Sequence, residues 1–217
     1  PKSKIRNLGD YYLTGDRYKE INEIKNQKWP LVELGKLFQR IHDPIDPKKA
    51  MGNIVYVGLE NIESNTGRLV GEVNIDTTKI KSLKFGFKKN DILFGRLRPN
   101  LNKVWIADRG GVCSTDIIVL RKMNEKVSSE LYSFILRSEN FIIEVLKGLR
   151  GAQLPRVGFD YISKIKIPLP PIEVQEGIIK EIDSYQKIVS LASEMTQVKG
   201  INITIDPSWQ RIPLNDL

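Results

Sequence analysis

The sequence predicts an α+β fold in which a mixed, β-rich domain with packed helices is followed by one long, coiled-coil-forming helix. Three observations lead to this prediction. Residues 91–94 and 117–120 are short apolar runs with the length and the β-branched or aromatic content of buried strands. Residues 128–149 carry one apolar stripe at helical spacing. Residues 172–199 carry apolar residues at heptad spacing.

Composition limits the class of protein. The chain has 217 residues, 41% hydrophobic and 28% charged, which is enough for one sizeable core with an appendage. No apolar run approaches the roughly 18 residues that cross a bilayer, and the N-terminal residues lack the apolar centre of a signal peptide. We therefore expect a cytoplasmic protein with no membrane partner. Cys113 and His42 are the only residues of their types, which excludes a disulfide framework and argues against a Cys/His zinc site within this chain.

The first half of the chain reads as a leader followed by short strands. Residues 1–28 are polar and mixed in charge, without a sustained period, and are interpreted as a leader or linker. Residues 29–35 alternate like a strand and lead into a short helical stretch at 36–41. After an irregular, proline-containing loop, residues 54–59 and 69–75 are further strand candidates.

The second half begins with the helix at residues 128–149. Ser128 or Ser129 is its expected cap, and we expect a break near Ser138. A loop at residues 150–157 follows, and residues 162–167 then alternate with period two as in a strand. Four residues rich in proline, 168–171, end the regular structure of this domain, which we place at residues 29–168.

The helix after these prolines has a narrow apolar seam. A helix over 172–199 would be about 42 Å long, and we assign residues 169–200 to it as a spacer. The alternatives are an ordinary amphipathic helix that folds back on its own domain and a helix that pairs with a partner, which the narrow seam favours. The expected interface residues are Ile178, Ile182, Tyr185, Val189 and Ala192.

A weak internal repeat appears at the C-terminus. Residues 29–37 (WPLVELGKL) and 209–217 (WQRIPLNDL) align at a constant offset, with Trp29 matching Trp209 and Leu37 matching Leu217. Repeats of this kind indicate repeated structural units. We therefore interpret residues 201–217 as a linker and the first strand of a second, truncated domain.

Positive charge is concentrated in two segments. The chain has a formal net charge of +8, and residues 84–109 alone hold +5 while residues 147–166 hold +4. Clustered positive charge indicates a polyanion partner. Arg pairs in a bidentate manner with guanine edges or phosphate, and Asn pairs with adenine. The alternative to a nucleic-acid surface is that Arg and Asn are simply common in exposed turns.

The candidate contacts fall into two groups by residue type and loop context. Base contacts are expected from Arg96, Arg98, Asn100, Arg150, Gln153 and Arg156. Phosphate contacts are expected from Lys84, Lys88, Lys89, Lys103, Arg109 and Lys147. For Gln153, Leu154 and Pro155 a purely structural role stays open.

Several stretches together resemble one family. The segments NDILFGRLRPNLNKVWIADRGGVCSTDIIVLR and GAQLPRVGFDYISKIKIPLPPIEVQEGII, with the opening at residues 29–37, are similar to the DNA-specificity (S) subunit of type I restriction-modification enzymes. The resemblance covers roughly residues 29–217. It implies that residues 29–168 are a target-recognition domain that reads one half of a bipartite target in double-stranded DNA, and that 201–217 begin a second such domain.

The resemblance also implies partners. The spacer helix would pair antiparallel with its counterpart, in a homodimer or with a second specificity half. It would also dock N6-adenine methyltransferase subunits, and a restriction subunit would join the complex. The leader LTGDRYKEINEIKNQKWPLVEL is similar to the junction at which a methyltransferase runs into a recognition domain, so residues 1–28 are interpreted as the tail of a methyltransferase-like region.

No catalytic residue is expected in this chain. An Asn-Pro-Pro-Tyr-like tetrapeptide and a glycine-rich cofactor loop after a strand are both missing from the sequence. A nuclease set built from Asp10, Glu23 and Lys25 is a chance grouping in so charged a sequence. We expect no cofactor here, because S-adenosylmethionine would bind the partner methyltransferase. The alternatives are the C-terminal part of a fused type I/IIG-like methyltransferase-restriction enzyme and a scaffold that binds nucleic acid without sequence specificity.

Overall fold

The computed structural model describes residues 28–49, 52–150 and 154–197. The chain divides into two compact units, Pro1–Ile178 and Ile179–Leu217, and each is considered by itself. Three sequence expectations lie outside the described residues: the leader apart from Lys28, Gln153, and the repeat at 201–217.

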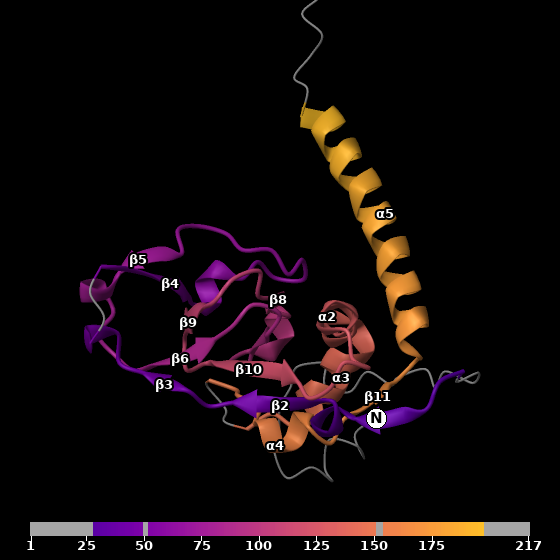
Figure 1. Cartoon of the computed structure of the whole chain (residues 1–217), viewed down its shortest axis with the longest axis horizontal. Helices are drawn as coiled ribbons and strands as arrows, with labels where there is room; N and C mark the ends of the chain where they lie inside the picture. The colour runs from indigo at the N-terminus through magenta and orange to yellow at the C-terminus, as the bar shows by residue number, and fades with distance from the viewer. Residues whose placement is uncertain (1–27, 50–51, 151–153, 198–217) are drawn as a thin grey trace, which may run out of the picture. The chain divides into compact units, whose positions relative to one another are not determined.

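In its described residues the first unit is an α+β domain with three sheets, which confirms the α+β part of the predicted fold class (Figure 1). A two-stranded sheet has the order β1-β11, a four-stranded sheet β2-β10-β7-β8, and a five-stranded sheet β3-β6-β9-β4-β5. The strands are β1 Leu31–Glu33, β2 Phe38–Ile41, β3 Pro44–Ile45, β4 Asn53–Val57, β5 Asn74–Asp76, β6 Lys84–Phe87, β7 Ile92–Gly95, β8 Val104–Ile106, β9 Gly111–Cys113, β10 Ile117–Lys122 and β11 Lys166–Pro168. The helices are α2 Ser129–Arg137, α3 Glu139–Lys147, α4 Phe159–Ile162 and α5 Ile172–Gln197. Short 3-10 turns are η2 Leu34–Lys36, η3 Pro47–Lys49, η4 Leu59–Asn61, η5 Thr77–Lys79 and η6 Pro99–Leu101.

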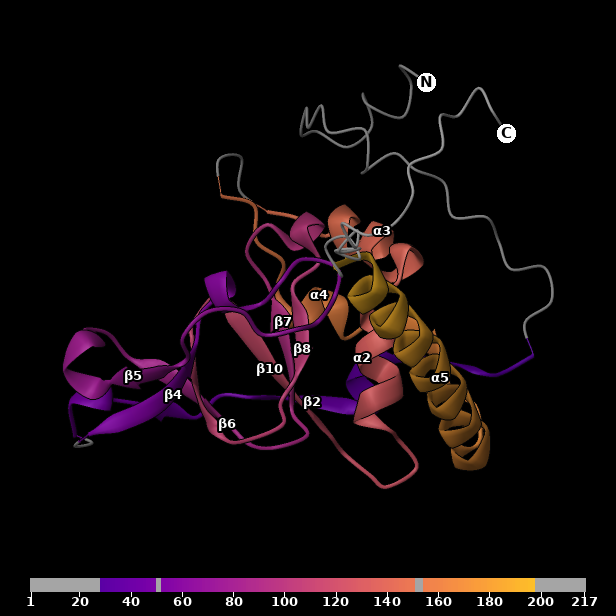
Figure 2. The same cartoon turned by 90° about the horizontal axis from the view of Figure 1, so that it is seen from above.

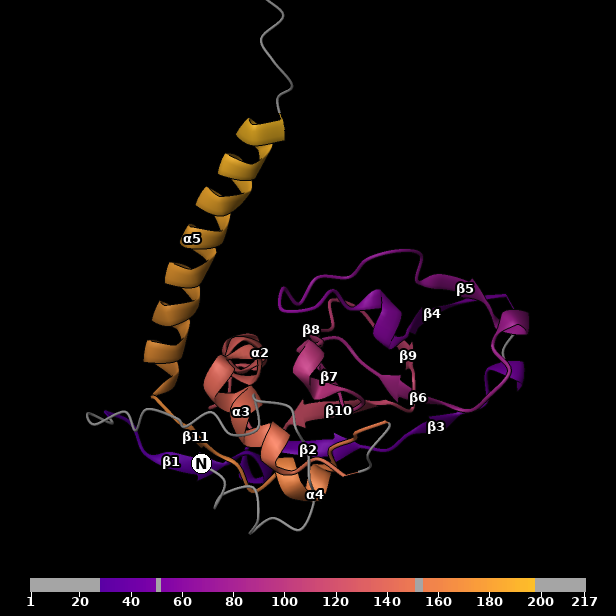
Figure 3. The same cartoon turned by 180° about the vertical axis from the view of Figure 1, so that it is seen from behind.

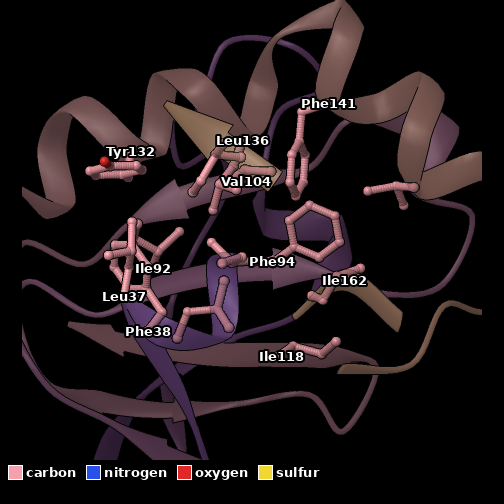
Figure 4. Close-up of a cluster of buried hydrophobic side chains, with 14 of the residues drawn as sticks. Leu37, Phe38, Ile92, Phe94, Val104, Ile118, Tyr132, Leu136, Phe141 and Ile162 are labelled. Atoms are coloured by element: carbon pink, nitrogen blue, oxygen red, sulfur yellow. The ribbon is translucent and has the colours of Figure 1, made fainter. Parts of the chain in front are cut away.

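The four-stranded sheet lies at the centre of the domain because its two middle strands, β7 and β10, are apolar on both faces. Ile92 and Phe94 of β7 point to one hydrophobic core, while Leu93 between them points to a second core. Helices α2 and α3 cover the first face, and strands of the five-stranded sheet cover the other (Figures 2 and 3). Figure 4 shows Phe94 of β7 next to Phe141 of α3, and their ring centroids are 6.1 Å apart.

The helical stripe is divided by a single serine, as the sequence predicts. Ser138 is the C-cap of α2 and the N-cap of α3, and its Oγ accepts a hydrogen bond from the Phe141 N–H at 3.4 Å. Ser128 caps α2 in the same way through the Leu131 N–H at 3.3 Å. The two caps allow both helices to keep an apolar face against the sheet despite the change of direction.

The Ser138 cap gives a testable stability effect. Ser138→Ala is expected to lower the free energy of unfolding by about 1 kcal/mol, because one N–H at the start of α3 loses its acceptor. Urea denaturation measures this change. Ser138→Asn keeps an acceptor and should stay close to wild type. Equal stability of the alanine variant and wild type would show that the cap contributes nothing.

Three local expectations were wrong or only partly right. Residues 36–41 do not form a helix, because β2 pairs antiparallel with β10 and buries Phe38. Ile162 ends α4 and lies in the core, so the strand expected from that residue begins only at Lys166. In the third case, Leu69 forms only an isolated bridge with Ile62, and β5 begins later, at Asn74. Tertiary packing overrides local propensity at each of these positions.

The predicted long helix is present as α5, and its first turn is fixed to the domain by Gln175. This side chain is fully buried. Its Nε2 donates to the carbonyl oxygens of Lys126 and Pro170 at 2.9 and 2.8 Å, and its Oε1 accepts from the Ser128 N–H at 2.9 Å. A buried amide with all these bonds made is a strong local constraint. The start of α5, up to Ile178, therefore belongs to the first unit.

Candidate nucleic-acid interface

The chain leaves β7 through a basic hook, which we define as residues 96–102. Arg98 and Asn102 both have left-handed backbone conformations, with φ of 48° and 49°. Such conformations are costly for residues other than glycine and persist only where neighbouring structure imposes them. Here the Arg98 N–H donates to the Pro155 carbonyl at 2.9 Å, and the Asn102 side chain donates to the Arg137 carbonyl at 2.8 Å. The hook is therefore held in one conformation by hydrogen bonds to two other parts of the domain.

The loop predicted at residues 150–157 lies beside the hook. Arg150 and Arg156 pair across it through two backbone hydrogen bonds of 3.0 and 2.9 Å. Leu97 of the hook forms an isolated antiparallel bridge with Arg156, and the Val157 N–H donates to the Arg96 carbonyl at 3.1 Å. The hook and the second loop, of which the structure describes residues 150 and 154–157, are far apart in the sequence but are joined by main-chain hydrogen bonds. We call the surface that they form the two-loop surface.

Arg156 and Arg96 both contact Asp116, and Arg40 is close enough to Arg96 for their positive charges to interact. We call Arg40, Arg96, Arg156 and Asp116 the arginine cluster. Asp116 accepts from Arg156 Nε at 2.8 Å and Nη2 at 3.4 Å, and this contact raises the pKa of Arg156. Burial lowers the pKa of Arg96, as does the positive charge of Arg40; Asp116 opposes these effects and Arg156 adds to them. The cluster therefore holds more positive than negative charge.

Sequence reasoning missed Arg40, which lies on β2 beside Leu120 of β10. The signal that could have found it was the alternation Phe-Gln-Arg-Ile, which is typical of a strand. In a strand, Arg40 shares a face with Phe38, whose side chain enters the first core. The residue was overlooked because the segment was expected to be helical.

Asn100 is exposed on the hook and lines a pocket of about 430 Å³. The asparagines at positions 65 and 102 line the same pocket, with side chains from the α2 and α3 region on its other side.

Five of the six predicted base-contact residues lie on the two loops of the two-loop surface. The sixth, Gln153, belongs to the loop but lies outside the described residues.

Two of the predicted phosphate-contact residues, Lys84 and Lys103, are partly or fully buried and bond to neighbouring segments. Lys84 is only 9% exposed, its Nζ donates to Ser82, and it lies over the Tyr56 ring at 5.6 Å. Lys103 donates to the Leu59 carbonyl at 2.6 Å. Lys84 in particular is satisfied by its own surroundings, so we do not include it in the functional proposal below.

The other predicted phosphate-contact residues lie on exposed turns and helix ends. Lys88 and Lys89 precede β7, and Arg109 follows β8, which pairs antiparallel with β7. These three residues therefore lie at the opposite end of β7 from the hook. Arg109 pairs with Asp108 at 2.6 Å. Lys147, in the last turn of α3, forms an ion pair of 2.6 Å with the carboxylate of the residue at position 144.

The described residues offer little for covalent or metal chemistry. Within 28–49, 52–150 and 154–197, no group of three His, Cys, Asp or Glu side chains has the arrangement of a metal site. Burial raises the pKa of Cys113 to about 12, so its thiol stays protonated at neutral pH. None of the helices in these ranges combines the length and hydrophobicity needed to span a membrane. The arrangement is suited to binding anionic and hydrogen-bonding groups.

The described residues thus form an α+β domain with a cationic surface made of two hydrogen-bonded loops, followed in the sequence by a long helix. The chain belongs to the type I restriction modification DNA specificity domain family, which matches residues 26–198. This confirms the resemblance found in the sequence.

Known relatives agree with the family. The chain is 25% identical over 170 residues to the type I restriction enzyme EcoDI specificity subunit of Escherichia coli, covering 77% of this chain and 36% of that protein. It is 24% identical over 194 residues to the HindI specificity subunit of Haemophilus influenzae, covering 83% and 40%. The crystal structure of the HsdS subunit from Thermoanaerobacter tengcongensis matches with a TM-score of 0.65 and 25% identity, over 78% of this chain and 45% of that one. The chain thus spans less than half the length of these relatives.

Proposed function

We propose that this chain recognises a short sequence in double-stranded DNA, as one half of a bipartite target of a type I restriction-modification system. The observation that carries the proposal is the two-loop surface, in which two separate basic segments are hydrogen-bonded to each other. Half-site recognition needs several base-reading side chains on one rigid surface. The family and its relatives, which are specificity subunits, support this function.

Arg98 and Arg150 are the main base-reading residues in this proposal. Both are exposed, and no hydrogen bond or ion pair engages either guanidinium in the part of the chain that the structure describes. The backbone of Arg98 is bonded to Pro155 of the second loop, and the backbone of Arg150 is bonded to Arg156 across that loop. A free guanidinium on a fixed backbone is suited to bidentate pairing with guanine O6 and N7 in the major groove. Asn100 adds an amide of the kind that pairs with adenine.

Selection from a pool of random duplex DNA, at two salt concentrations, tests this function. We expect enrichment of a motif of about 3–5 base pairs that survives added salt, because base contacts persist where phosphate contacts weaken. Binding that is lost with salt and enriches no motif would contradict the proposal and favour a sequence-blind scaffold. Chemistry would be supplied by partners, with S-adenosylmethionine bound by the methyltransferase.

The long helix is the proposed site of assembly. In the second unit, α5 exposes large apolar side chains that include Tyr185 at 59%, Ile188 at 62% and Val189 at 63%. Exposed apolar faces of this kind mark interaction sites. We propose that α5 forms a coiled coil with a second copy or a second specificity half. Ile188 widens the apolar face beyond the predicted seam, which suits the additional docking of N6-adenine methyltransferase and restriction subunits.

Self-association can be tested with charges on the seam. Ile182→Asp with Val189→Asp is expected to convert a dimer into a monomer, because two carboxylates would be buried in the apolar interface. Light scattering after size exclusion measures the mass. Lys180→Asp with Lys187→Asp places the same residue type at the same spacing on the opposite face and should leave the dimer intact. A seam variant with the wild-type mass, or a monomeric wild type, would contradict pairing.

A further inference from the structure

The arginine cluster differs from the rest of the two-loop surface in its charge balance. Its three arginines are Arg40 of β2, Arg96 directly after β7, and Arg156, which forms isolated bridges in the second loop. One carboxylate, that of Asp116, lies among them and binds Arg156. Residues 151–153, Gly-Ala-Gln, carry no charge and so leave this balance unchanged.

Arg96 shows the consequence of this imbalance most clearly. Its side chain is partly buried, and its Nε is buried without a hydrogen-bond partner among the residues that the structure describes. Burial and the neighbouring charge of Arg40 both lower its pKa. Cations held close together in a partly desolvated place are stabilised by a full negative charge more than by the neutral edge of a base.

The fixed position of Asp116 limits what it can neutralise. Its backbone carbonyl accepts from the Arg96 N–H at 2.9 Å, and its own N–H donates to Ser114 Oγ at 3.2 Å. The carboxylate is thereby held on the Arg156 side of the cluster. Arg40 and Arg96 are left to share an external anion.

We infer that Arg40 and Arg96, beside the Asp116-bound Arg156, bind one phosphate of the DNA backbone and so set the register of the duplex, while Arg98 and Arg150 read bases. The inference rests on the proposed function. It reassigns Arg96, which the sequence suggested as a base contact, adds Arg40, and leaves Arg156 paired with Asp116. Phosphate contacts position a protein on DNA without carrying sequence information.

The test compares Arg40→Gln with Arg96→Gln, made together, against Arg98→Gln alone. Affinity for the selected duplex is measured over a range of salt concentrations, and each variant is also put through selection. The double variant is expected to lose about one unit from the salt exponent, the amount that corresponds to one phosphate contact, and to select the wild-type motif. Arg98→Gln is expected to relax one motif position.

Replacing single phosphates of the selected duplex with neutral methylphosphonates locates the contact. Wild type should lose affinity at one particular phosphate to which the double variant is indifferent. A changed motif in the double variant, or a salt exponent and methylphosphonate profile identical to wild type, would overturn the inference while leaving the proposed function standing. Failure of wild type to select any motif would instead overturn the proposed function.

Discussion

Arg121→Met is expected to lower the free energy of unfolding by about 3–5 kcal/mol, because it leaves the buried carboxylate of Asp91 without its partner. Asp91 is 1% exposed, and its two oxygens accept from Arg121 Nε and Nη2, both at 2.7 Å. Hydrogen bonding to Asp91 raises the pKa of Arg121. The Lys88 N–H, at 2.8 Å, would be the main remaining donor to the carboxylate.

Urea denaturation measures this effect, and two further variants serve as controls. Arg68→Met removes an exposed ion pair with Glu63 and should change stability little. Asp91→Asn combined with Arg121→Met removes the buried charge as well, so it should cost less than the sum of the two single changes. A loss below about 1 kcal/mol in Arg121→Met would show that the pair does not hold β7 and β10 together.

Removing both proposed base readers should nearly abolish sequence-specific binding. Arg98→Ala with Arg150→Ala is expected to cost about 2–6 kcal/mol on the selected duplex, from about 1–3 kcal/mol for each base contact. Binding to an unrelated duplex should change much less, because most of its affinity comes from phosphate contacts. Fluorescence anisotropy with both duplexes gives the ratio.

The control for this prediction lies at the other end of β7. Lys88→Ala with Lys89→Ala removes two exposed lysines that precede the strand. If they contact phosphates, binding to both duplexes should weaken by a similar factor and the salt dependence should fall. An equal loss on both duplexes in the Arg98 and Arg150 variant would show that these arginines also contact only the backbone.

The elements that could be predicted from the sequence are those whose local pattern agrees with their tertiary environment. β7 and β10 are apolar on both faces, as the central strands of a covered sheet must be. Ser138 predicts the break between α2 and α3 because a serine side chain can accept a hydrogen bond from a backbone N–H in the first turn of the next helix. In contrast, β2 depends on its pairing with β10, a distant segment, and its local pattern also permits a helix.

The candidate site could be predicted in composition but not in arrangement. Charge clustering pointed to both basic segments. Their junction depends on backbone groups, such as the Arg98 N–H and the Pro155 carbonyl, which do not distinguish one residue type from most others. The number of charges in a segment also does not show which lysines face solvent. The ammonium of Lys84, for example, binds Ser82 within the fold. Arg40 was missed for the related reason that its position depends on the pairing of β2.

Hydrogen–deuterium exchange on binding of the selected duplex tests most directly whether the two loops form one DNA-reading surface. We predict slower exchange in the peptides spanning residues 96–101 and 150–157 together, with unchanged exchange in the turn at 123–126, which serves as the internal reference. Protection of both loops at one saturating DNA concentration would be the result expected of a single surface. Protection of only one loop, or of neither, while the duplex is bound would contradict the account.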